Sequence, residues 1–188
     1  MVERTAPNNL THRLATTDDV PSLRAIVDEA IGVLQAYYLT PEQVTSSRAI
    51  MGLDLQLVED GTYFVIECDG GIAGCGGWSR RSTLYGNDAT PRRDAALLNP
   101  STEPARVRAM YTDPRFARRG VGRLILSLCE SAAAAEGFHE LELMATLSGH
   151  PLYRSFGFVD VEEVTDDTGG APVPLIRMRK TVNAQDRG

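Results

Sequence analysis

The chain has 188 residues, of which 43% are hydrophobic and 23% are charged, as in an ordinary soluble domain that folds on its own core. Its net charge of -6 disfavours broad nucleic-acid binding, which needs a basic surface. No apolar run approaches the ~18–20 residues of a membrane span, and the first residues lack the apolar stretch of a signal peptide. We therefore expect one domain in the cytoplasm, with neither a nucleic-acid nor a membrane partner.

The cysteines and histidines give no sign of a disulfide framework or a metal site. Three cysteines are an odd number without a CxxC pair, and the three histidines lack the spacing of metal ligands. We expect isolated thiols and imidazoles, and no metal. These residues are Cys68, Cys75, Cys129, His12, His139 and His150.

The N-terminal part of the sequence predicts a strand and two helices. Residues 9–16 are typical of a short strand, and Thr17 is the expected N-cap of a helix that continues to Leu34. Pro41 is expected to begin a second helix, roughly 41–52. The first helix is predicted from the apolar residues that recur on one face, namely Val20, Leu23, Ile26, Val27, Ala30, Ile31 and Leu34.

A hairpin follows over two β-rich runs, 62–68 and 71–79, with Asp69 and Gly70 at the turn. The second run is rich in glycine, which indicates a bulge or a close approach of another backbone. A loose edge strand explains these glycines equally well. They are Gly71, Gly74, Gly76 and Gly77.

Residues 80–104 show neither helical nor strand periodicity and are rich in turn formers. Loops longer than about 12–15 residues in a compact domain are usually functional or disordered. We expect a long loop insertion, which serves either as a lid over a cleft or as an oligomer contact.

The remaining sequence predicts alternating strands and helices, so the class is α/β with a mixed sheet. The elements are a strand that ends at Pro114, a helix over about 119–136, a strand over 139–146, a short helix over 149–156, strands over 157–164 and 173–180, and a frayed tail over 181–188. Gly137 is the expected C-cap of the longer helix. Its predicted buried stripe is Val121, Leu124, Ile125, Leu128, Cys129 and Ala132.

The stretch "ARRGVG" at 117–122 lies between a predicted strand and a predicted helix, a geometry that binds anions. Gly120 and Gly122 permit close approach, and arginines flank them. No Lys-Ser/Thr pair follows, as a nucleotide P-loop requires, and a third glycine is missing for a dinucleotide fingerprint. Taken alone, the stretch fits a phosphate loop or an ordinary turn equally well.

Two motifs together resemble the GNAT superfamily of N-acetyltransferases: "VRAMYTDPRFARRGVGRLIL", and "LYRSFGF" about thirty residues later. The resemblance covers about 105–160. It implies one GNAT-like domain over 1–188, with a mostly antiparallel sheet of about seven strands and helices on both faces. It also implies transfer of an acetyl group from acetyl-CoA, as co-substrate, to a primary amine in a small molecule or peptide. Whether the chain forms a homodimer is left open by the sequence.

The resemblance further implies a set of site residues. The strand over 107–112 is expected to splay from the strand over 139–145, and the pantetheine to lie between them. The implied cofactor-binding residues are Met110, Tyr111, Thr112, Arg118, Arg119, Gly120, Val121, Gly122, Arg123 and Ser148. The implied general acid is Tyr153, which in the alternative packs beside Phe156 and Phe158.

The sequence departs from the family pattern at two positions. Ala117 stands where the loop motif usually has Arg or Gln, and we expect Arg118 and Arg119 to compensate. Residues Thr146 and Ser148 lie where the family often has an asparagine, and either hydroxyl is a candidate substitute in contacting the pantetheine.

Proton transfers set the demands on the catalytic groups. A free tyrosine has a pKa near 10 and a thiol near 8.5, so protonating the leaving thiolate is uphill by about 2 kcal/mol. This transfer is feasible if the site lowers the pKa of Tyr153 slightly. Deprotonating an alkylamine of pKa about 10.4 costs about 4.6 kcal/mol at pH 7.

The general base is not evident, because Arg106 and Arg108 occupy the strand where many family members have a glutamate. Glu67, Glu142 and a water chain are unranked candidates. This gap favours an alternative function, a non-catalytic module that binds or senses acyl-CoA.

The acceptor site is expected near Tyr37 and Tyr38, near Trp78 of the hairpin, and along the 80–104 insertion. Arg106 and Arg108 alternate along one strand, so they share a face and are candidates to hold an acidic group of the acceptor.

Overall fold

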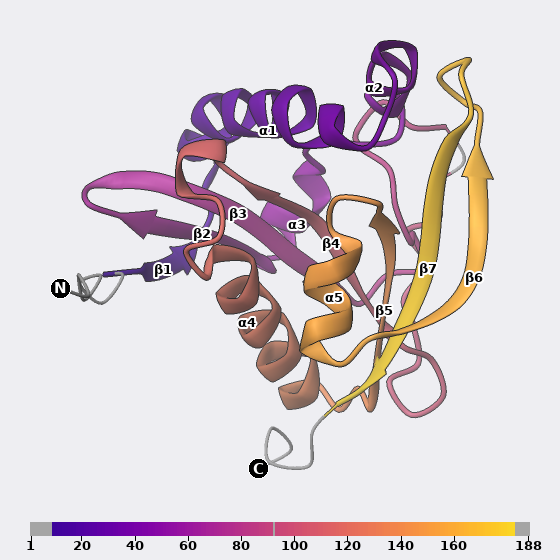
Figure 1. The fold of residues 1–188 in the computed structure, drawn as a ribbon. Coiled ribbons are helices and arrows are strands. Elements are labelled where there is room, and N and C mark those ends of the chain that lie inside the picture. Colours follow the sequence, from indigo (N-terminus) through magenta and orange to yellow (C-terminus); the bar gives the residue numbers. More distant parts are fainter. Residues whose placement is uncertain (1–8, 92, 183–188) are drawn as a thin grey trace, which may run out of the picture.

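The computed structural model describes residues 9–91 and 93–182, which form one seven-stranded sheet with helices on both faces (Figure 1). The strands are β1 (Thr11–Leu14), β2 (Tyr63–Cys68), β3 (Gly71–Ser79), β4 (Ala105–Thr112), β5 (Glu140–Thr146), β6 (Val159–Asp166) and β7 (Val173–Thr181). The α-helices are α1 (Val20–Leu34), α2 (Pro41–Ser47), α3 (Leu55–Glu59), α4 (Val121–Ala135) and α5 (His150–Phe156). Short 3-10 turns are η1 (Thr17–Asp19), η2 (Gln35–Tyr37) and η3 (Pro114–Phe116).

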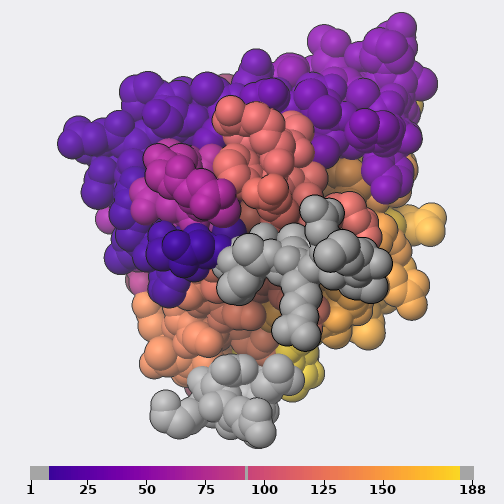
Figure 2. Space-filling model, turned by 60° about the vertical axis from the view of Figure 1, so that its left-hand side comes forward, coloured from indigo at the N-terminus to yellow at the C-terminus, as the bar shows by residue number. Residues whose placement is uncertain are grey.

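The strand order is β1-β2-β3-β4-β5-β7-β6. Neighbouring strands pair antiparallel except β4 and β5, which are parallel. The predicted mixed, mostly antiparallel α/β sheet is therefore confirmed. One core lies between the sheet and α4, and another between the sheet and the α1 and α3 helices. In the space-filling view, the indigo atoms of α1 lie directly above the salmon atoms around η3 (Figure 2).

Among the residues that the structure describes, no helix is both long and apolar enough to span a membrane.

The glycines of β3 allow α4 to pack closely on the sheet. β3 is an interior strand between β2 and β4, so the loose-edge interpretation is wrong. A Cβ built on Gly74 would lie 2.6 Å from Val121 Cγ1 and 2.7 Å from the Tyr111 carbonyl oxygen. One built on Gly76 would lie 2.8 Å from Ile125 Cγ2. Ile66 pairs with Gly74 and Glu67 with Ile72, so Ala73 is an extra residue of β3 and the predicted bulge is present as well.

The N-terminal helices differ from the prediction at their ends. Thr16, not Thr17, caps the first turn, because its side chain and backbone form a capping box with Asp19. The second helix ends at Ser47 rather than near residue 52. The sequence analysis missed α3, whose N-cap is Asp54.

The buried face of α4 is displaced from the predicted stripe. Val121, Ile125 and Cys129 are fully buried as expected, but Leu124, Leu128 and Ala132 are partly buried. Leu126 and Ala133 are fully buried instead, because the helix also packs beside α5. Glu136, rather than Gly137, is the C-cap, and Gly137 follows it in a left-handed conformation with φ 90°.

The C-terminal strand extends further than predicted. Thr181 belongs to β7, and Val182 is buried and donates its backbone N–H to the His139 carbonyl at 2.9 Å. The remainder of the predicted frayed tail, 183–188, lies outside the described residues.

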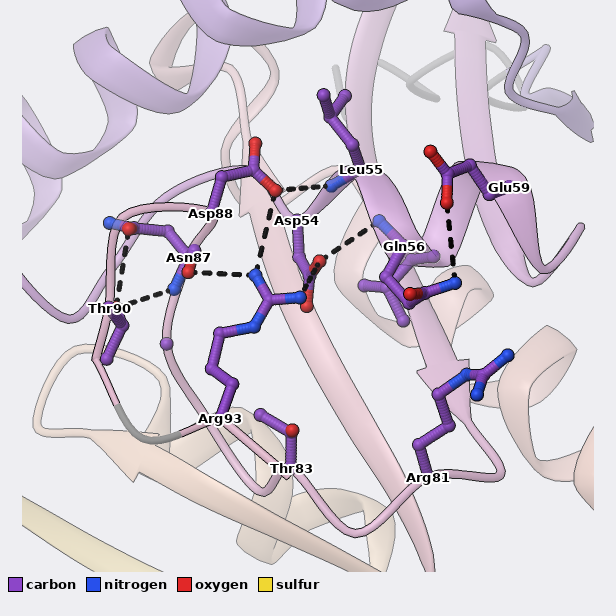
Figure 3. Close-up of polar contacts among 12 residues, drawn as sticks. Asp54, Leu55, Gln56, Glu59, Arg81, Thr83, Asn87, Asp88, Thr90 and Arg93 are labelled. Atoms are coloured by element: carbon purple, nitrogen blue, oxygen red, sulfur yellow. Dashed lines mark hydrogen bonds and ion pairs between the residues drawn. The ribbon is translucent and has the colours of Figure 1, made fainter. Parts of the chain in front are cut away.

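The insertion over 80–104 is irregular, as predicted, apart from an isolated bridge between Arg81 and Leu97. Two ion pairs attach it to the α3 region. Arg81 reaches Asp60 at 2.7 Å. Arg93 reaches Asp54 at 3.0 Å, as Figure 3 shows. Its described part is therefore anchored to the body of the domain.

We expect Gly74→Ala to lower the free energy of unfolding by about 1–3 kcal/mol, because the added methyl overlaps a backbone carbonyl that cannot move aside. Gly71→Ala in the same strand is the matched control, since its Cβ would meet its nearest neighbour, the Cys68 carbonyl oxygen, at 3.9 Å. Urea unfolding of both variants measures the difference. Equal stabilities would contradict the close-packing explanation.

Candidate active site

A cavity of about 1230 Å³ opens where β4 and β5 part. Their parallel ladder contains two residue pairs, Ala105 with Leu141 and Arg106 with Glu142. Beyond these pairs both strands continue and contribute to the cavity wall, β4 as far as Thr112 and β5 as far as Thr146. The predicted splay of these two strands is therefore present in the structure.

A bulge bends β4 inside this cavity. Tyr111 pairs with Cys75, whereas Arg108 pairs with Gly77, so two residues of β4 stand opposite Gly76. Ala109 at the bulge has φ 51°, which is uncommon for a residue other than glycine. The buried Tyr63 hydroxyl donates a hydrogen bond to the Ala109 carbonyl at 2.7 Å. This contact holds the bulge, which turns the backbone of β4 toward the cavity.

The loop before α4 has the geometry expected of an anion site. Arg118 and Gly120 both have positive φ, 62° and 88°, and Gly120 is the N-cap. As glycine has no side chain to cap the helix, the first-turn amides are left to a ligand. A Cβ on Gly122 would lie 2.5 Å from Leu152 Cδ2, so the glycine allows α5 to approach.

Most of the site residues implied by the sequence lie in the wall of this one cavity. They are Met110, Tyr111, Thr112, Arg118, Gly120, Val121, Gly122, Arg123, Ser148 and Tyr153. Arg119 lies outside this set, and its guanidinium is 5.5 Å from the ring centroid of Phe116. Ala117 also lines the cavity, so the position that departs from the motif is part of the wall.

The hydroxyls that replace the family asparagine form a small hydrogen-bond network. Gln35 Nε2 donates to Ser148 Oγ at 2.8 Å and to Thr146 Oγ1 at 3.3 Å. Thr146 Oγ1 in turn accepts the Gly149 amide at 3.2 Å. Gln35 Oε1 is buried without a partner among the residues that the structure describes.

Tyr153 both lines the cavity and packs beside Phe158, with ring centroids 6.1 Å apart. The two interpretations of this residue are therefore compatible. Burial, with a smaller effect of Cys129, raises the pKa of Tyr153 to about 12. The condition for easy proton transfer, a lowered pKa of Tyr153, is therefore not met, because the apolar surroundings disfavour the phenolate.

One part of the cavity wall is formed by α1, η2 and the insertion, with residues from the segment after α2, from β4 and from β5. We call it the tyrosine end, after its three tyrosines. Its wall comprises Val33, Leu34, Tyr37, Tyr38, Ile50, Met51, Leu84, Tyr85, Gly86, Arg108 and Met144. Trp78, which was expected here, is buried in the core against Phe138, with centroids 5.9 Å apart.

None of the Asp and Glu side chains that the structure describes lines the cavity. Glu67, on β2, forms an ion pair with Arg13 at 3.0 Å. Glu142 is buried in ion pairs with Arg106, Arg177 and Arg179. Neither candidate base therefore belongs to the cavity wall.

Arg106 and Arg108 also have partners of their own. Arg106 pairs with Glu142, and Arg108 is buried with Asp54 at 2.8 Å while it donates to the Gly86 carbonyl at 2.8 Å. Of these two arginines, Arg108 belongs to the cavity wall.

Comparison with known proteins identifies the family. Residues 59–160 match the family model described as the acetyltransferase (GNAT) domain. The chain belongs to the GNAT acetyltransferase family. The matched segment includes β4, the loop before α4 and Tyr153, which carry the motifs noted in the sequence.

Solved structures of other GNAT proteins share the fold. A GCN5-related N-acetyltransferase from Rhodopseudomonas palustris is 17% identical with a TM-score of 0.70, and the match covers 95% of this chain and 99% of that one. YncA from Salmonella typhimurium, solved with acetyl-CoA, is 18% identical with a TM-score of 0.61, covering 94% and 96%. PaiA N-acetyltransferase from Thermoplasma acidophilum, solved with coenzyme A, is 14% identical with a TM-score of 0.60, covering 92% and 99%.

No curated protein matches the chain in sequence.

Sequence reasoning missed three contributors to this site: the bulge at Ala109, the Tyr63 hydroxyl that holds it, and Gln35. None has a local signal, because each depends on a contact with a distant segment. Gly149 is different, since a glycine four residues before Tyr153 on a helix faces that ring. A Cβ at Gly149 would lie 2.7 Å from Tyr153 Cε2.

We expect Gly149→Ala to displace the Tyr153 ring, because the added methyl would also lie 3.3 Å from the hydroxyl oxygen. The ring signals of Tyr153 in an NMR spectrum should shift, with a loss of about 1–3 kcal/mol in unfolding free energy. Tyr153 signals that coincide with those of the unsubstituted protein would contradict this packing.

Proposed function

We propose that the protein is an acetyl-CoA-dependent N-acetyltransferase that acts on a primary amine by direct attack in a ternary complex. One observation carries the proposal: a single cavity contains the anion-binding loop, the bulged strand β4 and Tyr153. The comparisons support acetyl transfer through membership of the family.

The residues around the α4 loop fit a coenzyme A pyrophosphate. Gly120 presents the helix amides, Gly122 keeps α5 close, and Arg118 and Arg123 bring positive charge to the wall. Arg118 is proposed to compensate for Ala117. The guanidinium groups of Arg119 and Arg123 each lie 5.5 Å from a ring centroid, that of Phe116 and that of Phe156 respectively. Met110, Tyr111 and Thr112 are proposed to hold the pantetheine, with Ser148 opposite.

The chemistry that acetyl-CoA supplies is an activated acetyl thioester. The bulge at Ala109 turns backbone amides of β4 toward the cavity, where an N–H can polarise a carbonyl. Tyr153 is proposed to act on the leaving sulfur. With its pKa at about 12, full proton transfer to a thiolate of pKa about 8.5 is uphill by about 5 kcal/mol. Tyr153 therefore donates a hydrogen bond that becomes strongest as the sulfur gains charge.

The amine must lose its proton without help from a lining carboxylate. We propose that the acceptor binds as the free amine, or passes its proton to water in the cavity. The fraction of free amine then limits the rate near neutral pH.

The test is release of free thiol from acetyl-CoA in the presence of amines. We expect Tyr153→Phe to lower kcat by about 10²-fold, because the hydroxyl that meets the sulfur is lost. The dissociation constant of acetyl-CoA should stay within about threefold. Full activity in Tyr153→Phe would reject its catalytic role and leave the family assignment intact.

A second candidate is a module that binds acyl-CoA without turnover, favoured by the absence of described carboxylates from the cavity wall. Both candidates predict thermal stabilisation by acetyl-CoA, worth about 2.7 kcal/mol at 100 times the dissociation constant. Turnover distinguishes the two candidates, because the binding module releases no thiol from acetyl-CoA with any amine.

The pH dependence distinguishes a free-amine mechanism from one with an internal base. We expect kcat/KM to rise about tenfold per pH unit between pH ~7 and ~9, following the free amine of pKa about 10.4. Because Tyr153 keeps its proton until a pH of about 12, it adds no falling limb in this range. A plateau from pH ~7 upward, in a pH–rate profile at saturating acetyl-CoA, would show that a base acts in the site.

A further inference from the structure

The tyrosine end of the cavity has an apolar and aromatic wall. Tyr37 is 79% exposed and Val33 is 41% exposed, so both present accessible surface there. Tyr85 contributes a third ring, whose hydroxyl donates to Asp166 at 2.7 Å. An apolar or aromatic substrate body is the natural complement of such a wall.

One ion-pair cluster beside this end contains more arginines than carboxylates. We define the Asp54 network as Asp54, Asp88, Arg24, Arg93 and Arg108. Figure 3 shows Asp54, Asp88 and Arg93. Asp54 pairs with Arg93 and Arg108, and Asp88 pairs with Arg93 at 3.6 Å and Arg24 at 3.2 Å. Three arginines thus meet two carboxylates, which leaves one positive charge.

A second ion-pair cluster, on β4 to β7, also contains three arginines and two carboxylates. We define the Glu142 network as Glu142, Glu162, Arg106, Arg177 and Arg179. All three arginines reach Glu142, and Arg177 also reaches Glu162 at 3.0 Å. Glu142 lies two residues before Met144, which lines the cavity, so both side chains lie on the same face of β5.

Three carboxylates around the tyrosine end, those of Asp54, Glu142 and Asp166, are already engaged. Asp54 and Glu142 are held by arginines, and Asp166 accepts the Tyr85 hydroxyl. Arg108 is the charged residue of the wall at this end. Burial lowers the pKa of the Arg108 guanidinium, Asp54 offsets part of this effect and Arg93 adds to it. A second cation placed here would be repelled by Arg108, and no Asp or Glu among the described wall residues would balance it.

We propose that the acceptor is a primary amine on an apolar or aromatic body that carries no second positive charge. This inference rests on the proposed acetyl transfer and narrows its substrate class. Polyamines and aminoglycosides are excluded from that class by their additional cations, whereas a neutral or carboxylate-bearing tail is accepted.

The experiment compares three amines of matched length and different tails: hexylamine, ε-aminohexanoate and hexamethylenediamine. We expect kcat/KM for at least one of the first two to exceed that for the diamine by about tenfold or more. Hexylamine and ε-aminohexanoate distinguish a neutral from an anionic tail. 2-Phenylethylamine tests the aromatic body and should match or exceed hexylamine.

Val33→Glu places a carboxylate on this wall at an exposed position, and Val33→Gln is its neutral control. We expect the ratio of diamine to hexylamine in kcat/KM to rise about tenfold in Val33→Glu relative to Val33→Gln. Leu97→Glu adds the same charge at a residue that is 66% exposed and outside the cavity wall, and should leave the ratio unchanged.

A diamine rate equal to or above that of the other amines would overturn the inference while leaving acetyl transfer established. A ratio that does not change in Val33→Glu would likewise overturn it. Acetyl-CoA binding without thiol release from any amine would overturn the proposed function and this inference together.

Discussion

The structure depends on the parting of β4 from β5. The two strands pair through Arg106 and Glu142 and then diverge, so their remaining backbone faces a cavity instead of a neighbour. Unpaired backbone groups in the middle of a sheet are unfavourable unless water or a ligand satisfies them. The diverging strands therefore leave room for a ligand along the backbone of β4, and this is where the proposed function places the pantetheine.

Several contacts hold this opening in place. Glu142, buried at the last pair, requires its three arginines because an isolated buried carboxylate is strongly unfavourable. The Tyr63 hydroxyl fixes the Ala109 bulge. On the other side of the sheet, the small residues of β3 let α4 sit low enough for its first turn to reach the cavity. The opening between β4 and β5, the bulge at Ala109 and the first turn of α4 therefore depend on one another.

The same ion pairs that stabilise the fold also give the cavity its charge. Asp54 and Glu142 form ion pairs with arginines. Among the described residues, the charged members of the cavity wall are Arg108, Arg118 and Arg123. Under the proposed function, this positive charge suits the phosphates of acetyl-CoA at the α4 loop and selects among amines at the tyrosine end. The burial that raises the pKa of Tyr153 keeps its hydroxyl available as a donor.

The sequence by itself determined the α/β class, most of the strands and helices, and the family. These features have local signals: the hairpin turn at Asp69 and Gly70, the periodicity of α4, and the glycine loop followed by Tyr153. It failed for α3, for the end of α2 and for the buried face of α4, which depend on packing against distant segments.

Only the tertiary structure decided the character of the site. The position of Arg108 in the wall, the engagement of Glu142, the core position of Trp78 and the raised pKa of Tyr153 all arise from contacts between residues far apart in the chain. Local pattern shows which residue types are present, whereas their charge balance and solvation depend on which neighbours folding brings to them.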